Sequence, residues 1–199
     1  MEFKNFCIRE DYQIREKNDF LDTSGRSDEY QNDVYLLAKK IANENNVNYV
    51  SDVGCGSAYK LMKYFLEYNT VGYDLELTVN FLRKKYPKNV WVVSNFNDKP
   101  QKADLVICAD VIEHVDNPDD LMRFIMKMNP KHVIISTPDR DLLHEILGRS
   151  HTGPPINKHH IREWAYDEFY NYISQYFNVI QHEKIFKEYG QVIYCTKKI

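Results

Sequence analysis

Apolar residues recur along this chain in two alternating patterns. Short blocks that are almost continuously apolar are each followed by a segment in which apolar residues return every three or four positions. The first pattern predicts buried strands and the second predicts amphipathic helices. The predicted strands are 48–53, 70–74, 90–93, 103–109 and 132–136. The predicted helices are 58–68, 76–86, 118–128, 139–147 and 166–176. Strands that alternate with helices in this way are typical of a doubly wound parallel α/β sheet.

The two ends of the chain depart from this alternation. Segments 177–185 and 191–196 predict two last strands joined as a hairpin around Glu188, which adds an antiparallel pair at one edge. We therefore expect a mostly parallel sheet of seven strands in one domain, 1–199. Residues 1–26 are expected to form an N-terminal arm. Ser27 and Asp28 are cap candidates for a helix that follows the arm.

Composition and charge narrow the class of protein. The 199 residues are 43% hydrophobic, and 26 basic against 29 acidic residues give a net charge of −3. This balance argues against a protein that coats nucleic acid or an anionic membrane. No apolar run is long enough for a membrane helix, and residues 1–13 lack a secretory signal. The four cysteines form no CxxC pair, so we expect reduced thiols and a cytoplasmic protein, in the host cytoplasm if the chain is viral.

A glycine-rich turn follows the first predicted strand. It contains Asp52, Gly54, Cys55 and Gly56, and it opens the next helix. Glycine is required where the backbone turns sharply or lets a ligand approach closely, although a purely structural turn would have the same sequence. The third glycine of the dinucleotide fingerprint would fall at Tyr59 and is absent, which argues against NAD and FAD.

An acidic residue, Asp74, ends the second predicted strand. A carboxylate at this edge of the sheet can accept two hydrogen bonds from the vicinal diol of a ribose. The alternative is that Asp74 only caps the helix beginning near Glu76. The first interpretation predicts a nucleoside-containing ligand.

Three motifs together resemble a known family. DVGCGSA, VGYDLE and ADLVICADVIEHV, in this order, resemble class I S-adenosylmethionine-dependent methyltransferases over residues 48–140. The resemblance implies a Rossmann-like methyltransferase fold with S-adenosylmethionine as cofactor. It implies that the glycines pass beneath the methionine moiety, that Asp74 holds the ribose, and that Asn95 and Phe96 lie at the adenine. It places the residues ending the fourth strand beside the methyl group. The implied cofactor contacts are Asp52, Gly54, Cys55, Gly56, Asp74, Leu75, Asn95, Phe96 and Ala109.

A group of acidic and histidine side chains follows the fourth strand. If the turn is helical, Asp110, Glu113 and His114 share one face, because they are spaced i, i+3 and i+4. Two carboxylates and an imidazole suit a hard or borderline divalent cation. The alternative is that this stretch shapes a pocket without any metal.

A second histidine-containing segment, NKHHIREW, ends at Trp164. It resembles the downstream segment of two metal-dependent groups, the small-RNA 2′-O-methyltransferases and the ubiquinone-pathway O-methyltransferases. The resemblance implies that His160 joins the ligands Asp110, Glu113 and His114 around Mg²⁺ or Mn²⁺. Asp110 replaces a glutamate of the family pattern, so its contact could pass through water. A metal can polarise a hydroxyl, and His159 can take the proton as general base. Alternatively, the two histidines are a solvated pair and Trp164 only packs.

The sequence says least about the acceptor, the molecule that receives the methyl group. The loop 148–163 is polar and is expected to lie at the acceptor site. It resembles segments of small enzymes found among glycan gene sets, which favours a sugar hydroxyl, in a glycan or a nucleotide-linked precursor. Seven Lys or Arg against four Asp or Glu in 122–164 allow an anionic acceptor, although we expect no strong nucleic-acid binding. The alternatives are RNA 2′-O-methylation, methylation of a quinone-like small molecule, and a non-catalytic cofactor-binding domain. A further hypothesis is that Arg26 or Tyr30 closes over the cofactor. Another is that the protein forms a homodimer.

Overall fold

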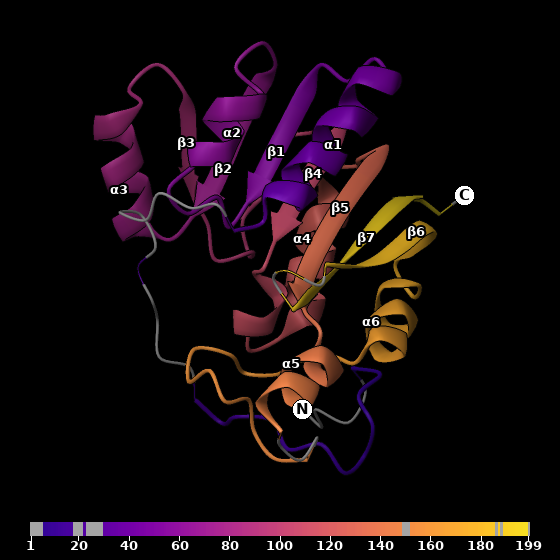
Figure 1. Cartoon of the computed structure of the whole chain (residues 1–199). Helices are drawn as coiled ribbons and strands as arrows, with labels where there is room; N and C mark the ends of the chain where they lie inside the picture. The colour runs from indigo at the N-terminus through magenta and orange to yellow at the C-terminus, as the bar shows by residue number, and fades with distance from the viewer. Residues whose placement is uncertain are drawn as a thin grey trace.

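Seven strands form one mixed sheet in the order β3-β2-β1-β4-β5-β7-β6 (Figure 1). A computed structural model describes residues 6–17, 22, 30–148, 152–185, 187 and 189–198. The strands are β1 (Tyr49–Val53), β2 (Asn69–Asp74), β3 (Val90–Val93), β4 (Leu105–Ala109), β5 (His132–Pro138), β6 (Phe177–Ile185) and β7 (Gly190–Lys197). The predicted sheet of seven strands is confirmed.

The strand pairing also agrees with the sequence pattern. β1 pairs in parallel with β2 and β4, and β2–β3 and β4–β5 are parallel as well. β7 runs antiparallel to both β5 and β6. The carboxyl ends of β1, β2, β4 and β5 therefore meet at one edge, which is where open α/β sheets bind ligands.

Helices pack on both faces of the sheet. The helices are α1 (Asn32–Glu44), α2 (Tyr59–Tyr64), α3 (Glu76–Lys85), α4 (Pro118–Lys127), α5 (Arg140–Leu147) and α6 (Tyr166–Ile173). Side chains of α1, α2 and α3 belong to one buried cluster, and those of α4 and α6 belong to a second. The residues of β4 alternate between these clusters and are all buried, so the central strand is apolar on both faces.

Some helix ends differ from the sequence prediction. The helix expected at 58–68 ends at Tyr64, because the backbone of Phe65 leaves the helical region with φ at −128°. The buried Phe65 ring has its centre 5.4 Å from that of Tyr68. The helix expected at 166–176 ends at Ile173. The helix expected at 118–128 spans Pro118–Lys127, and the Asn117 side chain caps it by accepting from the Asp119 N–H at 3.1 Å. The cap candidates Ser27 and Asp28, and Glu188 in the hairpin turn, lie outside the described residues.

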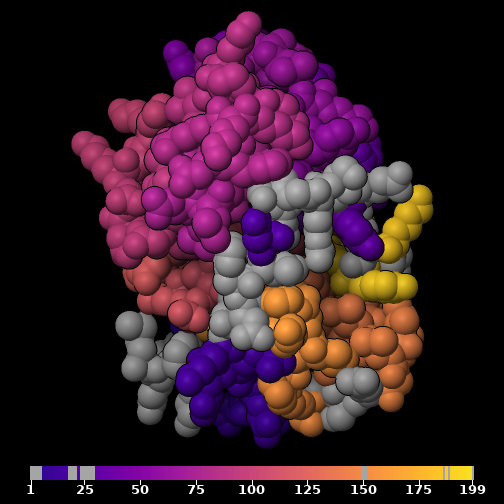
Figure 2. Space-filling model, turned by 90° about the vertical axis from the view of Figure 1, so that its left-hand side faces the viewer, coloured from indigo at the N-terminus to yellow at the C-terminus, as the bar shows by residue number. Residues whose placement is uncertain are grey.

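Two segments that are distant in sequence lie together below the carboxyl edge of the sheet. The N-terminal segment 6–17 runs beside the loop 152–165 and near α5 (Figures 1 and 2). This loop carries the predicted histidines. Among the described residues, no helix combines the length and the apolar character needed to cross a membrane.

Candidate functional site

The glycine turn after β1 depends on its glycines for two reasons. Gly54 and Gly56 have φ angles of 74° and 50°, in the left-handed region that favours glycine. A Cβ on Gly54 would also lie 2.3 Å from Cγ2 of Val111. Glycine at position 54 is therefore required by the packing of Val111 against the turn, and it also keeps the backbone open at the edge of the sheet.

Asp74 joins the ends of β1 and β2. Its Oδ2 accepts from the Gly56 N–H at 2.8 Å, and its Oδ1 accepts from the Leu75 N–H at 2.7 Å. Burial raises the pKa of Asp74, and these hydrogen bonds oppose the rise. Asp74 thus does more than begin α3, because it also fixes the glycine turn. The Thr78 side chain also donates to Asp74. A carboxylate has about four acceptor positions, which leaves one for a ribose hydroxyl.

The predicted adenine contacts lie beside Asp74, at the end of β3. The Ser94 N–H donates to the Asp74 carbonyl at 3.0 Å. Asn95 is exposed, and its Oδ1 accepts from the Asn97 N–H at 3.2 Å. Phe96 is half-buried, and its ring centre lies 5.6 Å from that of Phe124 in an edge-to-face arrangement. Asn95 therefore already makes a hydrogen bond within its own loop, and Phe96 already packs against the core.

The remaining predicted cofactor contacts divide into buried and exposed residues. Asp52 is fully buried and accepts from the Tyr35 hydroxyl at 2.8 Å. Burial, with Asp74 and Asp52 nearby, raises the pKa of the Cys55 thiol well above its usual value, so this thiol stays protonated. The carbonyl of Ala109 accepts from Gln31 Nε2 at 3.1 Å, and Leu75 is 43% exposed.

Asp110 does not lie where the helical spacing predicts. Its φ is 52°, and the 3-10 helix η2 (Ile112–His114) begins only after it. Its Oδ1 accepts from Ser136 Oγ at 2.6 Å, and its Oδ2 accepts from Gln31 Nε2 at 3.0 Å. The expectation that Asp110 shares one helical face with Glu113 and His114 was wrong, because the backbone reverses before the helical turn starts.

The other three predicted metal ligands converge. Among the described residues, Glu113, His114 and His160 form one group whose ligand atoms lie within 4.8 Å of one another. Glu113 is 1% exposed, and its Oε2 accepts from Thr137 Oγ1 at 3.1 Å. Its Oε1 is buried with no hydrogen-bond partner and lies 3.7 Å from His114 Nε2. A buried carboxylate oxygen facing imidazole nitrogens is a good ligand for a cation.

Hydrogen bonds set the tautomers of both histidines. His114 Nδ1 donates to the His159 carbonyl at 2.6 Å, which leaves its Nε2 with a lone pair. His160 Nδ1 donates to Glu163 Oε1 at 2.6 Å, and its Nε2 lies 2.9 Å from Asn157 Nδ2. A carboxylate behind a histidine orients the ring and increases its basicity as a ligand. The two rings lie edge to face, 4.8 Å apart.

The electrostatics of this group suit a divalent cation. Burial raises the pKa of Glu113 to about 8, Asp110 adds to the rise, and His160 opposes it. Burial also lowers the pKa of His114, so its ring is neutral near pH 7. A bound cation would favour the ionised Glu113 and the neutral imidazoles. One carboxylate and two imidazoles fit Mn²⁺ and related borderline ions.

The predicted base and the neighbouring tryptophan have different surroundings. His159 is half-buried, and its backbone carbonyl accepts from His114 Nδ1, so His159 lies next to the metal-ligand group. Trp164 is fully buried, and its Nε1 donates to the Phe6 carbonyl at 3.0 Å. Trp164 therefore has the packing role that was the alternative interpretation.

Several residues of the site were not found from the sequence. They are Gln31, Ser136, Thr137, Asn157 and Glu163. Thr137 could have been found, because it lies at the carboxyl end of a central strand, and Glu163 because it follows His160 by three residues. Arg26 and the 149–151 part of the predicted acceptor loop lie outside the described residues.

Comparison with a protein family identifies the domain. The family described as "Methyltransferase domain" matches residues 24–195. No curated protein matches at a significant level.

Solved structures share the fold at low sequence identity. The PH0226 protein from Pyrococcus horikoshii OT3 is 19% identical, with a TM-score of 0.63, over 87% of this chain and 93% of that chain. Magnesium protoporphyrin IX methyltransferase from Synechocystis PCC 6803, solved with bound SAH, is 15% identical, with a TM-score of 0.64, over 87% and 90%. The small RNA methyltransferase HEN1 is 21% identical, with a TM-score of 0.64, over 92% of this chain and 27% of that one.

Proposed function

Because this chain belongs to the family of methyltransferase domains, and is a methyltransferase that uses S-adenosylmethionine, we propose that it methylates a sugar hydroxyl of a glycan or glycan precursor. In this proposal a divalent cation, Mg²⁺ or Mn²⁺, is held by Glu113, His114 and His160. The observation that carries the proposal is the buried Glu113 Oε1, which faces His114 and has no hydrogen-bond partner within the described part of the chain.

The cofactor half of the site is formed by the turn after β1 and the end of β2. S-adenosylmethionine supplies an electrophilic methyl group. Gly54 and Gly56 leave the edge of the sheet open to its methionine moiety, and Asp74 accepts from a hydroxyl of its ribose. Gln31 and Ser136 fix the carboxylate of Asp110 at the end of β4, between the cofactor half and the histidines.

The metal half of the site activates and orients the acceptor. A divalent cation polarises a hydroxyl group, lowers its pKa and can bind both oxygens of a vicinal diol. Glu163 holds the His160 ring with Nε2 as its acceptor nitrogen, and a cation at Nε2 would replace the Asn157 amide, whose Nδ2 lies 2.9 Å away. The His159 carbonyl fixes His114 in the same tautomer, with its Nε2 toward Glu113. Asp110, which lies outside the group of three ligands, would contact the cation through a water molecule. The His159 ring takes the hydroxyl proton as general base.

RNA 2′-O-methylation is the second candidate. It uses the same metal and the same kind of diol, and the similar HEN1 structure is that of a small RNA methyltransferase. We place it second because the net charge of −3 provides little general attraction for a polyanion.

A screen of acceptors separates these candidates. Labelled S-adenosylmethionine is incubated with the enzyme, Mn²⁺ and one of three acceptor classes: nucleotide sugars, methyl glycosides or short RNAs. We expect transfer to a sugar with a vicinal diol, and no transfer to the analogue in which the neighbouring hydroxyl is deoxy. Labelling of RNA alone would replace the first candidate with the second. Equal labelling of the deoxy analogue would contradict the chelation of a diol.

A further inference from the structure

The loop that carries His160 is held from outside by the N-terminal segment 6–17 (Figure 2). The Arg15 N–H donates to the Ile161 carbonyl at 2.8 Å. The Arg15 guanidinium donates through Nε to the His160 carbonyl at 3.2 Å, and through its Nη2 to the Pro155 carbonyl. One side chain thus bonds to two carbonyls of the loop, one of them in the proposed metal ligand itself.

The inner side of the same loop is bonded to the metal group. The Ile161 N–H donates to the Glu113 carbonyl at 2.7 Å, and the His160 N–H donates to the Asn157 carbonyl at 3.0 Å. No helix or strand covers residues 152–163, so these few bonds take the place of a regular backbone ladder. The position of His160 therefore depends on Glu113 on one side and on Arg15 on the other.

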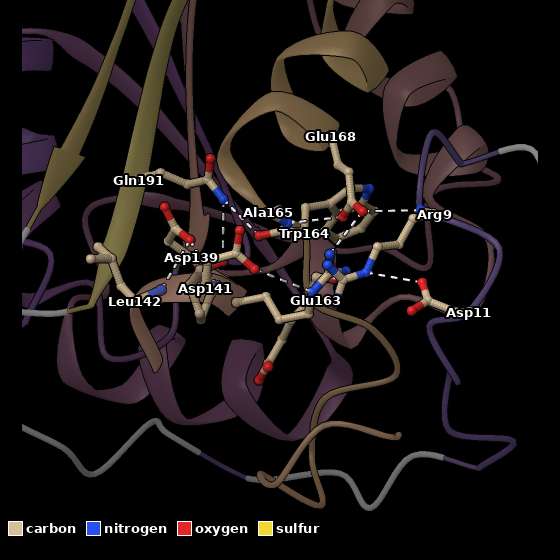
Figure 3. Close-up of polar contacts among 12 residues, drawn as sticks. Arg9, Asp11, Asp139, Asp141, Leu142, Glu163, Trp164, Ala165, Glu168 and Gln191 are labelled. Atoms are coloured by element: carbon tan, nitrogen blue, oxygen red, sulfur yellow. Dashed lines mark hydrogen bonds and ion pairs between the residues drawn. The ribbon is translucent and has the colours of Figure 1, made fainter. Parts of the chain in front are cut away.

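The N-terminal segment has other attachments that do not involve Arg15. The Phe6 carbonyl accepts from Trp164 Nε1, and the Arg162 guanidinium lies 4.5 Å from the Phe6 ring centre. Arg9 donates its N–H to Glu168 Oε1 at 3.0 Å. Figure 3 shows Glu168 on α6 between Arg9 and the backbone of Ala165. Replacement of Arg15 alone should leave the segment in place.

We propose that Arg15 is a positioning residue of the metal site, which holds His160 where its Nε2 can bind the cation together with Glu113 and His114. This proposal rests on the metal in the proposed function. An arginine is suited to this role because its planar group donates to two carbonyls in fixed directions. Partners that orient a metal ligand typically change metal affinity about 10–100-fold when they are removed.

Direct titration of Mn²⁺ into the full chain tests this role without acceptor or turnover. We expect wild type to bind one Mn²⁺ at the site, and Arg15→Gln to bind it at least about 10-fold more weakly. Arg15→Lys, which keeps the charge but donates from a single nitrogen, should fall between the two. Lys17→Gln is the matched control, because it removes a positive charge from an exposed position two residues away and should bind like wild type.

Two further measurements distinguish positioning from loss of fold. Affinity for S-adenosylmethionine should be unchanged in Arg15→Gln, and kcat should return toward wild type at saturating Mn²⁺ while the KM for Mn²⁺ stays raised. Equal Mn²⁺ affinity in wild type and Arg15→Gln would overturn the role of Arg15 and leave the metal proposal standing. Parallel loss of cofactor and Mn²⁺ affinity in Arg15→Gln would overturn it as well. Failure of wild type to bind Mn²⁺ would instead contradict the proposed metal site itself.

Discussion

At the scale of single residues, the carboxyl group of Glu113 is buried where its ionised form is costly in free energy. It is 1% exposed, it lies near Asp110, and one of its oxygens has no hydrogen-bond partner among the residues that the structure describes. An ionised carboxylate in such a place is costly unless an opposite charge is near. Burial lowers the pKa of His114, so its neutral ring does not supply that charge, whereas a bound cation can.

The first prediction concerns the pH dependence of stability in the metal-free protein. The pKa of Glu113 is raised from 4.5 to about 8 on folding. Between these values the folded state binds more protons, so the free energy of unfolding falls as pH rises. The loss at pH 7 is on the order of 3 kcal/mol. Glu113→Gln should remove this part of the pH dependence.

Denaturant unfolding of metal-free protein from pH 5 to pH 9 measures this effect. The curves of wild type and Glu113→Gln should diverge as pH rises, with the variant more stable above neutrality. Glu145→Gln, an exposed position on α5, is the control and should follow wild type. Parallel curves for wild type and Glu113→Gln would show that Glu113 is not a buried, uncharged acid.

The second prediction concerns Glu163, which accepts from His160 Nδ1 at 2.6 Å. Glu163→Gln keeps the size of the side chain but removes its charge, and so makes the His160 ring a weaker ligand. Affinity for Mn²⁺ should fall by about 10-fold, by the usual effect of such partners. Calorimetric titration with Mn²⁺ measures the change, and titration with S-adenosylmethionine should give the wild-type value. An unchanged Mn²⁺ affinity would exclude Glu163 from this role.

At the scale of elements, the sequence predicts the strands well and the turns between them less well. β4 could be predicted from its sequence because its five residues form a continuous apolar run. Such a run is typical of a strand that is buried on both faces of the sheet, and all five residues are buried. The left-handed backbone of Asp110 could not be predicted. It is accompanied by Ser136 on β5, which bonds both the carboxylate and the N–H of Asp110, and such a contact leaves no local pattern.

Contacts between residues far apart in the sequence could not be predicted either. Arg15 and the His160 carbonyl are 145 positions apart, and nothing near either residue indicates their pairing. His160 itself was predicted only through resemblance to metal-dependent enzymes. The glycine turn is the opposite case, because its sequence signal is local and its backbone angles agree with it.

The third prediction concerns this turn. Gly54→Ala places a Cβ in a left-handed conformation and 2.3 Å from Val111 Cγ2. The conformation alone costs about 1–2 kcal/mol, and the clash adds to this. Unfolding should show a loss of roughly 2–4 kcal/mol, together with weaker binding of S-adenosylmethionine. Adding Val111→Ala should recover the part due to the clash and leave the part due to the backbone. A double variant no more stable than Gly54→Ala would contradict this explanation.

At the scale of the whole molecule, the carboxyl edge of the sheet brings the two halves of the site together. The glycine turn and Asp74 come from β1 and β2, and Asp110 and Glu113 follow β4. His160, the third proposed ligand beside Glu113 and His114, lies on a loop that the N-terminal segment holds in place. Binding of a cation should therefore stabilise the folded chain as a whole, because the site exists only when these distant parts are assembled.

The fourth prediction follows from this linkage. At a Mn²⁺ concentration 100 times the dissociation constant, the free energy of unfolding should rise by about 2.7 kcal/mol. Thermal unfolding with and without Mn²⁺ measures the corresponding rise in melting temperature. His114→Ala should not respond to Mn²⁺, whereas His144→Ala, a histidine on α5 outside the ligand group, should respond like wild type. A Mn²⁺ response retained in His114→Ala would place the cation elsewhere.

The most direct test of the central claim is the rate of methyl transfer to a diol-containing sugar by enzyme stripped of metal and then supplied with Mn²⁺. We predict that stripped enzyme still binds S-adenosylmethionine but transfers no methyl group. Transfer should return as Mn²⁺ is added to wild type, and should stay absent in His114→Ala at the same concentrations. Full transfer by stripped enzyme, or restoration of His114→Ala along with wild type, would contradict a metal-dependent reaction at Glu113, His114 and His160.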